Sequence, residues 1–333
     1  MNRAKSFLQE KIKNFNISRF LTNWGSVIAL IVVTIFFAIR LKGLFLSPSN
    51  ITTILRSISI TTVIAIGITI TVAVGGFDLS SGAMASGAGV LVISFMIWYE
   101  MNMFQSISLT LIIAALFTLP IMLLIIVFKV PDLLATLAMM FLLDGIALTY
   151  SGGGSLSQGW PKPDGSPSLG IISDTFKEMG QAPTIIIIML IVILLAHIFL
   201  TYTKYGRFIY ATGENKEAAR LSGIPVKWYR LIAGMLSTLF IVIGGLLVAS
   251  RNVSAQIKGA SGFLMPAISA VFIGNSIAGA KKPNAIGTFL GAALVGILEN
   301  GLVMMSIPYY SLEAIKGLVL AIALATAYST SKE

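Results

Sequence analysis

Apolar runs of about the length that crosses a lipid bilayer recur along almost the whole chain. A membrane-spanning helix needs about 20 consecutive, largely apolar residues. Lipid offers the backbone no hydrogen bonds, so each run must satisfy its own N–H and C=O groups as a helix. The sequence therefore predicts an all-α, polytopic transmembrane bundle of about ten spans. Their approximate bounds are 24–40, 51–74, 80–98, 108–128, 133–150, 183–203, 231–250, 265–280, 284–305 and 311–328.

Composition excludes a soluble globular domain. Of 333 residues, 56% are hydrophobic and 11% are charged, whereas a soluble domain has about 25% charged residues. The formal charge of +10 is typical of a membrane protein with basic residues at its cytoplasmic surface. We therefore expect these residues to contact membrane lipid and not nucleic acid. The chain has no cysteine, which excludes disulfides and thiolate chemistry.

The distribution of Lys and Arg predicts the orientation in the membrane. If the N-terminus is cytoplasmic, 15 of the 23 basic residues fall in inside segments and eight fall outside. The positive-inside rule then places both termini and the loop 204–230 in the cytoplasm. We expect residues 1–23 to form a cytoplasmic or interfacial segment and residues 24–328 to form one transmembrane domain. The Gly-, Ser- and Pro-rich loop 151–181 falls outside, as a passive loop or as a surface for an extracytoplasmic partner.

The loop 204–230 carries six basic residues and the pattern of a short helix. Asn215 can cap this helix, Glu217 lies in its first turn, and Gly223 followed by Pro225 ends it. Two interpretations remain open: a solvated loop that only fixes orientation, or a helix that docks on a cytosolic partner. In the second, small residues allow close approach and charged residues are exposed for ion pairs. The small residues are Ala218, Ala219 and Gly223, and the charged residues are Glu217 and Arg220.

Two segments interrupt the apolar pattern, at 75–82 and at 251–264. Gly75 and Gly76 free the backbone in the first, and Asp78 with Ser80 and Ser81 can cap the helix that restarts there. Irregular backbone in a membrane is tolerated where it lines a cavity, so both segments predict broken helices. Five predicted spans separate them, which places them on opposite sides of the membrane and suggests an inverted repeat.

Acidic and amide side chains within apolar runs are candidate functional groups. Asp78 is either a helix cap or a solute contact, and Asp144 is expected to pair with a basic group of another helix. Glu299 and Asn300 are read either as interhelical contacts or as part of a polar path, and Asn275 is a similar candidate. Gly287 and Gly291 have the spacing of a close helix–helix contact.

The sequence lacks the motifs of nucleotide-binding and common catalytic sites. The segment 274–281 has the glycine spacing of a phosphate-binding loop but lacks the Lys-Ser or Lys-Thr pair. No HExxH motif, nucleophile elbow or cluster of metal ligands is present. We therefore expect no enzymatic activity, cofactor or metal, and any ATPase that drives the chain must be a separate protein.

Four stretches resemble the inner-membrane permeases of ABC-type sugar importers, the class of the ribose, xylose, arabinose and autoinducer permeases. They are GGFDLSSGAMASGAGV at 75–90, VPDLLATLAMMFLLDGIALTYSGG at 130–153, YGRFIYATGENKEAARLSGIPV at 205–226 and AISAVFIGNSIAGAKKPNAIGTFLGAALVGILENGL at 267–302. The chain departs from the family pattern at residues 262–268, where two acids are missing, and at Asp144, where an arginine is usual. These departures leave the solute unassigned.

The resemblance implies a permease subunit for a pentose-like sugar or a related small polar solute, in a bacterial inner membrane. The implied partners are a cytosolic ATP-binding cassette ATPase, an extracytoplasmic solute-binding protein and a second permease chain. The resemblance and the helix pattern of the loop 204–230 together give the residues expected to couple the chain to the ATPase. They are Glu214, Asn215, Glu217, Ala218, Ala219, Arg220 and Gly223. Those expected along the translocation path are Gly75, Gly76, Asp78, Ser80, Asp144, Asn275, Glu299 and Asn300. The alternative is an ion-coupled secondary transporter that uses the intramembrane carboxylates.

Overall fold

The protein is a helical bundle with one very small sheet. The computed structural model describes residues 17–275, 282–308, 311, 314–315 and 317–318. The helices are α2 (Ile17–Arg40), α3 (Pro48–Ala73), α4 (Ser81–Ile97), α5 (Met103–Ile126), α6 (Asp132–Tyr150), α7 (Asp174–Met179), α8 (Thr184–Tyr202), α9 (Lys204–Glu214), α10 (Lys216–Leu221), α11 (Val226–Asn252), α12 (Leu264–Asn275) and α13 (Ala285–Met304). Two 3₁₀ turns, η1 (Lys42–Leu44) and η2 (Ser261–Phe263), and the strands β1 (Leu156–Ser157) and β2 (Ser254–Ala255) complete it.

The helices confirm the predicted all-α class. Six of them, α3, α5, α6, α8, α11 and α13, are long and apolar enough to cross a membrane. Three shorter apolar helices, Gly25–Arg40, Ser81–Ile97 and Ser261–Asn275, coincide with three further predicted spans. The remaining predicted span, 311–328, lies mostly outside the described residues, as does most of the N-terminal segment 1–23. Helix α2 already begins at Ile17, before the predicted start of the first span.

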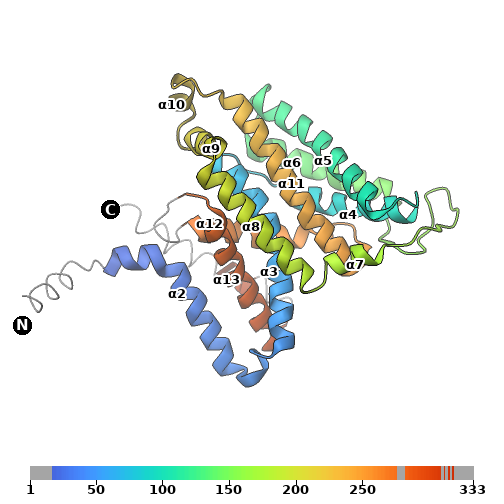
Figure 1. Cartoon of the computed structure of the whole chain (residues 1–333), viewed down its shortest axis with the longest axis horizontal. Helices are drawn as coiled ribbons and strands as arrows, with labels where there is room; N and C mark the ends of the chain where they lie inside the picture. The colour runs from blue at the N-terminus through green and yellow to red at the C-terminus, as the bar shows by residue number, and fades with distance from the viewer. Residues whose placement is uncertain (1–16, 276–281, 309–310, 312–313, 316, 319–333) are drawn as a thin grey trace, which may run out of the picture.

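Helices α3, α4 and α11 form the centre of the bundle, and other helices surround them (Figure 1). Fifteen residues of α4, and every residue of α3 from Ile58 to Ile70, are buried. A Cβ on Gly245 of α11 would overlap the backbone of Ala85 in α4, so the two helices cross at backbone contact. Helices α5, α6 and α8 instead expose large apolar side chains on one face, as lipid-facing helices do.

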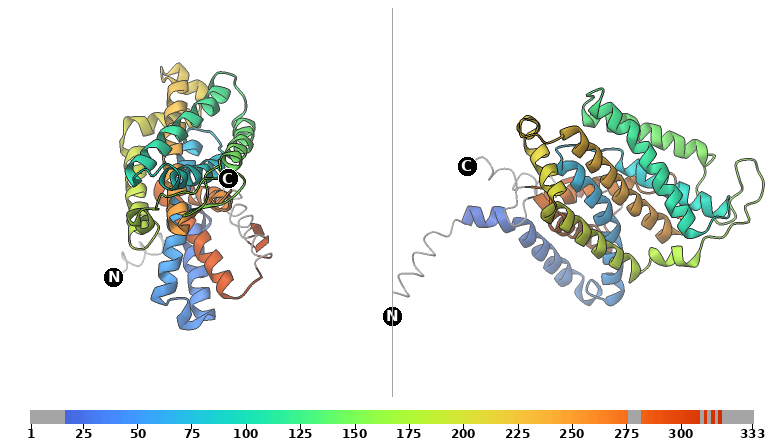
Figure 2. Two further views of the ribbon diagram at one scale, coloured as in Figure 1. Left: turned by 90° about the vertical axis from the view of Figure 1, so that its right-hand side faces the viewer. Right: turned by 45° about the horizontal axis from the view of Figure 1, so that its top comes forward.

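The two predicted breaks are present and open toward opposite ends of the bundle. The first separates Ala73, at the end of α3, from Ser81, at the start of α4, and it lies beside α9. The second follows α11, where β2 pairs with β1 of the long loop, Leu156 opposite Ala255. Figures 1 and 2 show α9 and α10 at one end of the bundle and the long loop with α7 at the other. We call these the α10 end and the α7 end.

The second break also reaches into the bundle and contacts the start of α4. The amide of Ala260 donates a hydrogen bond to the Ser86 hydroxyl at 3.0 Å. A Cβ on Gly82 would lie 3.2 Å from the Cα of Ser261, so a side chain there would have to displace the second break by a few tenths of an ångström. Helix α12 therefore starts inside the bundle and has only 12 described residues.

The glycine pair of α13 confirms the predicted close helix contact. A Cβ on Gly291 would overlap the carbonyl of Ala270 in α12, and a Cβ on Gly287 would overlap the carbonyl of Gly274. The contact is within the chain, so this spacing packs α12 against α13.

We expect Gly291→Ala to lower the free energy of unfolding by about 2 kcal/mol, because the added methyl group must separate two helices in backbone contact. The measurement is the thermal unfolding temperature of the purified protein in detergent. Gly145→Ala in α6 is the matched control, since a Cβ there meets no atom within 4 Å. Equal unfolding temperatures for the two variants would contradict the packing argument.

Candidate solute path and partner-docking surface

A small, partly polar cavity of about 30 Å³ lies beside the first break, between the end of α3, the start of α4, and α5, α6 and α11. This volume holds about two water molecules and is far below the roughly 300–1,000 Å³ of small-molecule sites, so the cavity is closed to a sugar-sized solute in this conformation. Its polar and charged lining residues are Thr71, Asp78, Ser80, Thr118, Asp132, Thr136, Arg230, Ser237 and Thr238. The break therefore lines a cavity, as irregular backbone inside a membrane protein is expected to do.

Asp78 holds the restart of the helix. Its Oδ1 accepts hydrogen bonds from the amide of Ser80 at 2.7 Å and from the Ser80 hydroxyl at 2.6 Å. Its Oδ2 accepts one from the Ser81 hydroxyl at 2.9 Å. The carboxylate thus orders the turn before α4, and the two serines donate to it. The prediction that Asp78, Ser80 and Ser81 accept the unpaired amides of the helix is wrong, because Ser80 makes no side-chain capping bond and Asp78 accepts from the amide of Ser80, which precedes the helix.

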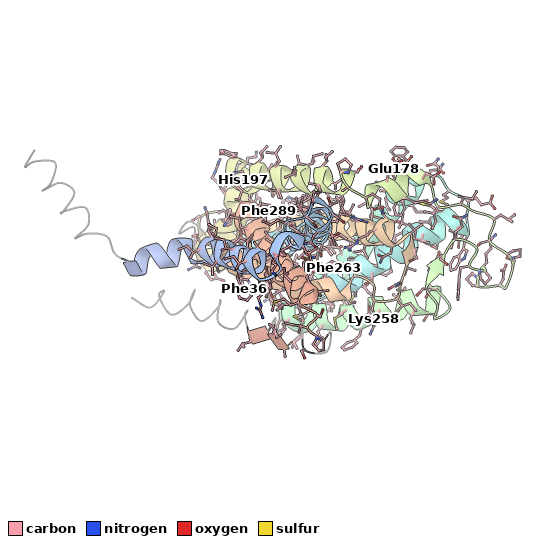
Figure 3. All side chains as sticks on the ribbon, turned by 90° about the horizontal axis from the view of Figure 1, so that it is seen from below. Phe36, Glu178, His197, Lys258, Phe263 and Phe289 are labelled. Carbon is pink, nitrogen blue, oxygen red and sulfur yellow. The ribbon has the colours of Figure 1, made fainter. Side chains whose placement is uncertain are left out.

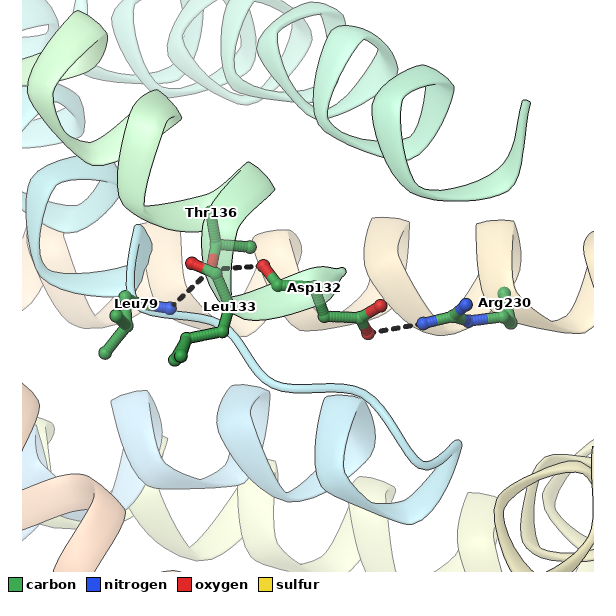
Figure 4. A network of polar contacts seen from close by, with 5 residues as sticks. All are labelled: Leu79, Asp132, Leu133, Thr136 and Arg230. Atoms are coloured by element: carbon green, nitrogen blue, oxygen red, sulfur yellow. Dashed lines mark hydrogen bonds and ion pairs between the residues drawn. The ribbon is translucent and has the colours of Figure 1, made fainter. Parts of the chain in front are cut away.

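A chain of polar contacts joins the first break to α6 and α11 (Figure 4). The amide of Leu79 donates to the Thr136 hydroxyl at 3.2 Å, and that hydroxyl donates to the Asp132 carbonyl at 2.8 Å. The Asp132 carboxylate forms an ion pair with Arg230 of α11, and the two side chains are only 19% and 13% exposed. Sequence reasoning counted Arg230 as a loop charge and missed Asp132, although its position after Pro131 at the edge of a predicted span was visible.

Gly76 makes room for this ion pair. A Cβ on Gly76 would lie 2.8 Å from the Asp132 carboxylate oxygen Oδ2 and 3.1 Å from Cγ2 of Thr71. Gly75 has a φ of +74°, and its backbone lies against Gly213 of α9. Both glycines of the predicted break are thus required by close approach, and Gly75 by its left-handed backbone as well.

Asp144 does not line this cavity. Its carboxylate lies 3.5 Å from Nζ of Lys258, in the second break, so it does pair with a basic group outside its own helix. Figure 3 shows Lys258 on the face of the bundle opposite Glu178 and His197. The pair therefore fastens the second break to α6, away from Asp78.

The remaining predicted path residues also lie outside the cavity. Asn300 of α13 and Asn50 of α3 exchange two hydrogen bonds, at 3.1 and 3.2 Å, so Asn300 joins two helices. Glu299 precedes it on α13, and Asn275 ends α12. Of the eight residues expected along a path, the cavity brings together Gly76, Asp78 and Ser80.

The predicted short helix exists as α10 at one end of the bundle. The Asn215 side chain accepts hydrogen bonds from the amides of Glu217 and Ala218, both at 3.0 Å, which confirms the predicted cap. Glu217 and Arg220 form an ion pair at 2.7 Å with side chains 71% and 70% exposed. Gly223 ends the helix with a φ of +79° and donates to the Arg220 carbonyl at 3.0 Å.

The surface that α10 offers to a partner differs from the one expected. Ala219 is buried, so it supports the helix and cannot touch a partner, whereas Ala218 is exposed. Leu221 is 83% exposed, and Trp228 at the start of α11 is 59% exposed. Exposed apolar side chains beside an exposed ion pair are typical of a protein-binding surface. Sequence reasoning missed Leu221, although it is the sole large apolar residue between Lys216 and Ser222.

Helix α9 connects α10 to the interior. Gly213 packs against the carbonyl of Ala73, at the end of α3, and the Tyr210 hydroxyl donates to the Pro283 carbonyl at 2.5 Å, just before α13. Burial raises the pKa of Tyr210 to about 12, so its hydroxyl remains a donor at neutral pH. Nζ of Lys282 lies 4.7 Å from the centre of the Tyr210 ring.

Comparison with known proteins identifies the family. Residues 50–324 match the family model described as "Branched-chain amino acid transport system / permease component". The chain belongs to this family of transport permeases. It is accordingly a membrane transport component. Among its described residues, no group of three or more His, Cys, Asp or Glu side chains could hold a metal ion.

Permeases named for sugars are similar to this one over nearly its whole length. The ribose import permease protein RbsC of Haemophilus influenzae is 33% identical over 321 residues, which cover 95% of this chain and 96% of that protein. RbsC of Escherichia coli is 31% identical over 303 residues, or 90% of this chain and 91% of that protein. The xylose transport system permease protein XylH of Escherichia coli is 25% identical over an alignment of 365 positions, covering 94% and 92%. These relatives confirm the resemblance to sugar permeases of ABC-type importers.

We expect Asp132→Asn to lower the free energy of unfolding by about 3 kcal/mol, because it leaves the Arg230 guanidinium largely buried without its carboxylate. The measurement is thermal unfolding in detergent. Arg220→Gln is the control, since it breaks an exposed pair worth less than about 1 kcal/mol. Asp132→Arg combined with Arg230→Asp is expected to recover part of the loss. An unchanged unfolding temperature for Asp132→Asn would show that the pair contributes nothing.

Proposed function

We propose that the chain is the membrane-spanning subunit of an ATP-driven importer that carries a pentose-like sugar or a related small polar solute. The observation that carries this proposal is similarity to permeases named for ribose over 95% of the chain. The family model is described for branched-chain amino acids, so the choice of a sugar depends on these named relatives. The lining of the cavity is compatible with this proposal, because several of its residues carry hydroxyl groups that a neutral solute would meet if the cavity widened.

The α10 end is proposed to be cytoplasmic and to carry the ATPase. The exposed Leu221 and the Glu217–Arg220 pair supply an apolar contact and two oriented charges, which suit a groove on a soluble partner. A second permease chain would complete the membrane assembly in the bacterial inner membrane. The α7 end, where the long loop lies, would then face outward and receive solute from an extracytoplasmic binding protein.

Transport would follow from movement of α10 relative to the bundle. ATP binding would draw two ATPases together and displace the docked α10, and α9 would pass the displacement to the end of α3, where the cavity begins. The cavity would then open alternately to the two sides.

Charge reversal on α10 tests the docking. We expect Glu217→Arg and Arg220→Glu, tested singly, to lower solute uptake, because losing about 1.4 kcal/mol of contact weakens binding of the ATPase roughly ten-fold. Because the pair is exposed, the unfolding temperature is expected to change little. The measurements are uptake and ATP hydrolysis by the assembled transporter in proteoliposomes.

Helix α7 provides a matched control. It also has six residues and an acid–base pair three residues apart, Asp174 and Lys177, with Nζ and Oδ1 at 2.7 Å. The Lys177 cation lowers the pKa of Asp174, so both groups are charged at neutral pH. Asp174→Lys is expected to leave ATPase binding unchanged, because α7 lies at the end of the bundle opposite α10. If the α10 variants behaved like this control and still bound the ATPase, the docking proposal would be wrong.

The alternative function is ion-coupled secondary transport. Two of its candidate carboxylates are already engaged, Asp78 by three hydrogen bonds and Asp144 by Lys258. We therefore expect a proton uncoupler, with ATP held constant, to leave uptake by the assembled transporter unchanged. Uptake that stopped with the uncoupler, or that continued without ATP, would favour the secondary transporter.

A further inference from the structure

One hydroxyl group in the cavity beside the first break has no partner. Ser237 of α11 lines this cavity and is 2% exposed, and its Oγ makes no hydrogen bond within the part of the chain that the structure describes. Buried hydroxyl groups are nearly always hydrogen-bonded, because an unpaired one loses its contacts with water and gains nothing in return. The free hydroxyl therefore has room to bind a water molecule, or a solute hydroxyl that takes the place of this water when the cavity widens.

The neighbouring residue extends the same polar strip. The hydroxyl groups of Thr238 and Thr118 lie 2.7 Å apart, and Thr118 also donates to the Ala114 carbonyl at 3.0 Å. A hydroxyl group has one proton, so Thr238 must donate to Thr118 and keeps an acceptor lone pair free. Ser237 adds one donor and two acceptor positions. Together they match the hydroxyl groups of a polyol, each of which both donates and accepts.

The charges on the lining exclude one class of solute. Arg230, the cation on the lining, is already paired with Asp132, and Asp78 is engaged in hydrogen bonds with Ser80 and Ser81. An anionic solute would be repelled without a free cation to bind it. Met84, Ile121 and Met122 form the apolar part of the wall and suit the C–H face of a sugar ring.

We infer that Ser237, with the Thr118–Thr238 pair, forms a subsite on the path of the solute that binds hydroxyl groups of an uncharged polyhydroxylated molecule. The inference rests on the proposed import function and adds the residues that touch the solute. The ion pair of Asp132 and Arg230 joins α6 to α11 beside this subsite, so it sets the width of the cavity between those helices.

Removal of the hydroxyl separates a binding role from a structural one. Ser237→Ala breaks no hydrogen bond in the protein, so the unfolding temperature is expected to stay the same or to rise. Uptake of D-ribose by the complete transporter is expected to fall roughly five-fold, the effect of about one lost hydrogen bond.

Thr62→Val is the matched control. Thr62 of α3 also has a buried hydroxyl without a partner among the described residues, but it does not line the cavity. This variant is expected to transport D-ribose like the wild type. Equal uptake by Ser237→Ala and the wild type would overturn the subsite.

A second experiment measures whether solute occupies the subsite. The chain has no native cysteine, so a cysteine introduced at position 237 is the one thiol of this chain that can react. Ser237→Cys, in the complete transporter in inside-out vesicles, is treated with a small cationic methanethiosulfonate reagent. We expect labelling that slows in saturating D-ribose and does not slow in its anionic analogue ribonate. Labelling that D-ribose leaves unchanged, or no labelling at all, would contradict the subsite. Thr62→Cys is the control, because slower labelling there in D-ribose would indicate a conformational change and not direct contact with the solute.

The two proposals fail in different ways. If the wild-type complex imported no pentose, the proposed function would be wrong, whatever the behaviour of Ser237. If the wild type imported D-ribose and the Ser237 variants were neither slowed nor protected, the subsite alone would be wrong.

Discussion

The structure depends on how a broken backbone is satisfied inside the bundle. Between α3 and α4, the amides of Gly75 and Gly76 bond to carbonyls of α3 at 3.0 and 2.9 Å, and the amide of Leu79 bonds to Thr136 of α6. The amide of Ser80 bonds to the Asp78 carboxylate. Each unsatisfied group here would cost several kcal/mol. These partners hold α6 against the break, and α6 in turn carries the carboxylate that pairs with Arg230.

Local chemistry explains why parts of this architecture could be read from the sequence. Two glycines followed by Asp and two Ser residues predict an interruption with a cap, and Asn215 followed by Glu217 predicts a helix start; both depend on residues within a few positions of each other. Gly287 and Gly291 predicted a close contact because only a residue without a side chain permits one. The structure confirms the interruption, the helix start at Asn215 and the close contact, whereas no side chain of the Asp and Ser group caps α4.

Long-range pairing was the part that the sequence could not supply. Asp132 and Arg230 are 98 residues apart, and no local pattern connects them. Asp144 was expected to find a basic partner, but Lys258 could be named only once β1 and β2 had paired and the second break had folded back on the bundle. Ala219 was placed on the wrong face, because a six-residue helix is too short for its periodicity to show which side is buried. Ser237 stood out only when its lack of a partner could be seen.

The junction of α9 and α10 has a consequence for the transmission of movement. Asn215 is both the C-cap of α9 and the N-cap of α10, so no linker separates the two helices. Close-packed contacts transmit strain. Within one helix, Gly213 rests on the end of α3, and Tyr210 is bonded to the residue before the cap of α13. The same helix thus contacts the connection before α4 and the connection before α13, so a displacement of α10 that moved α9 would act on both connections.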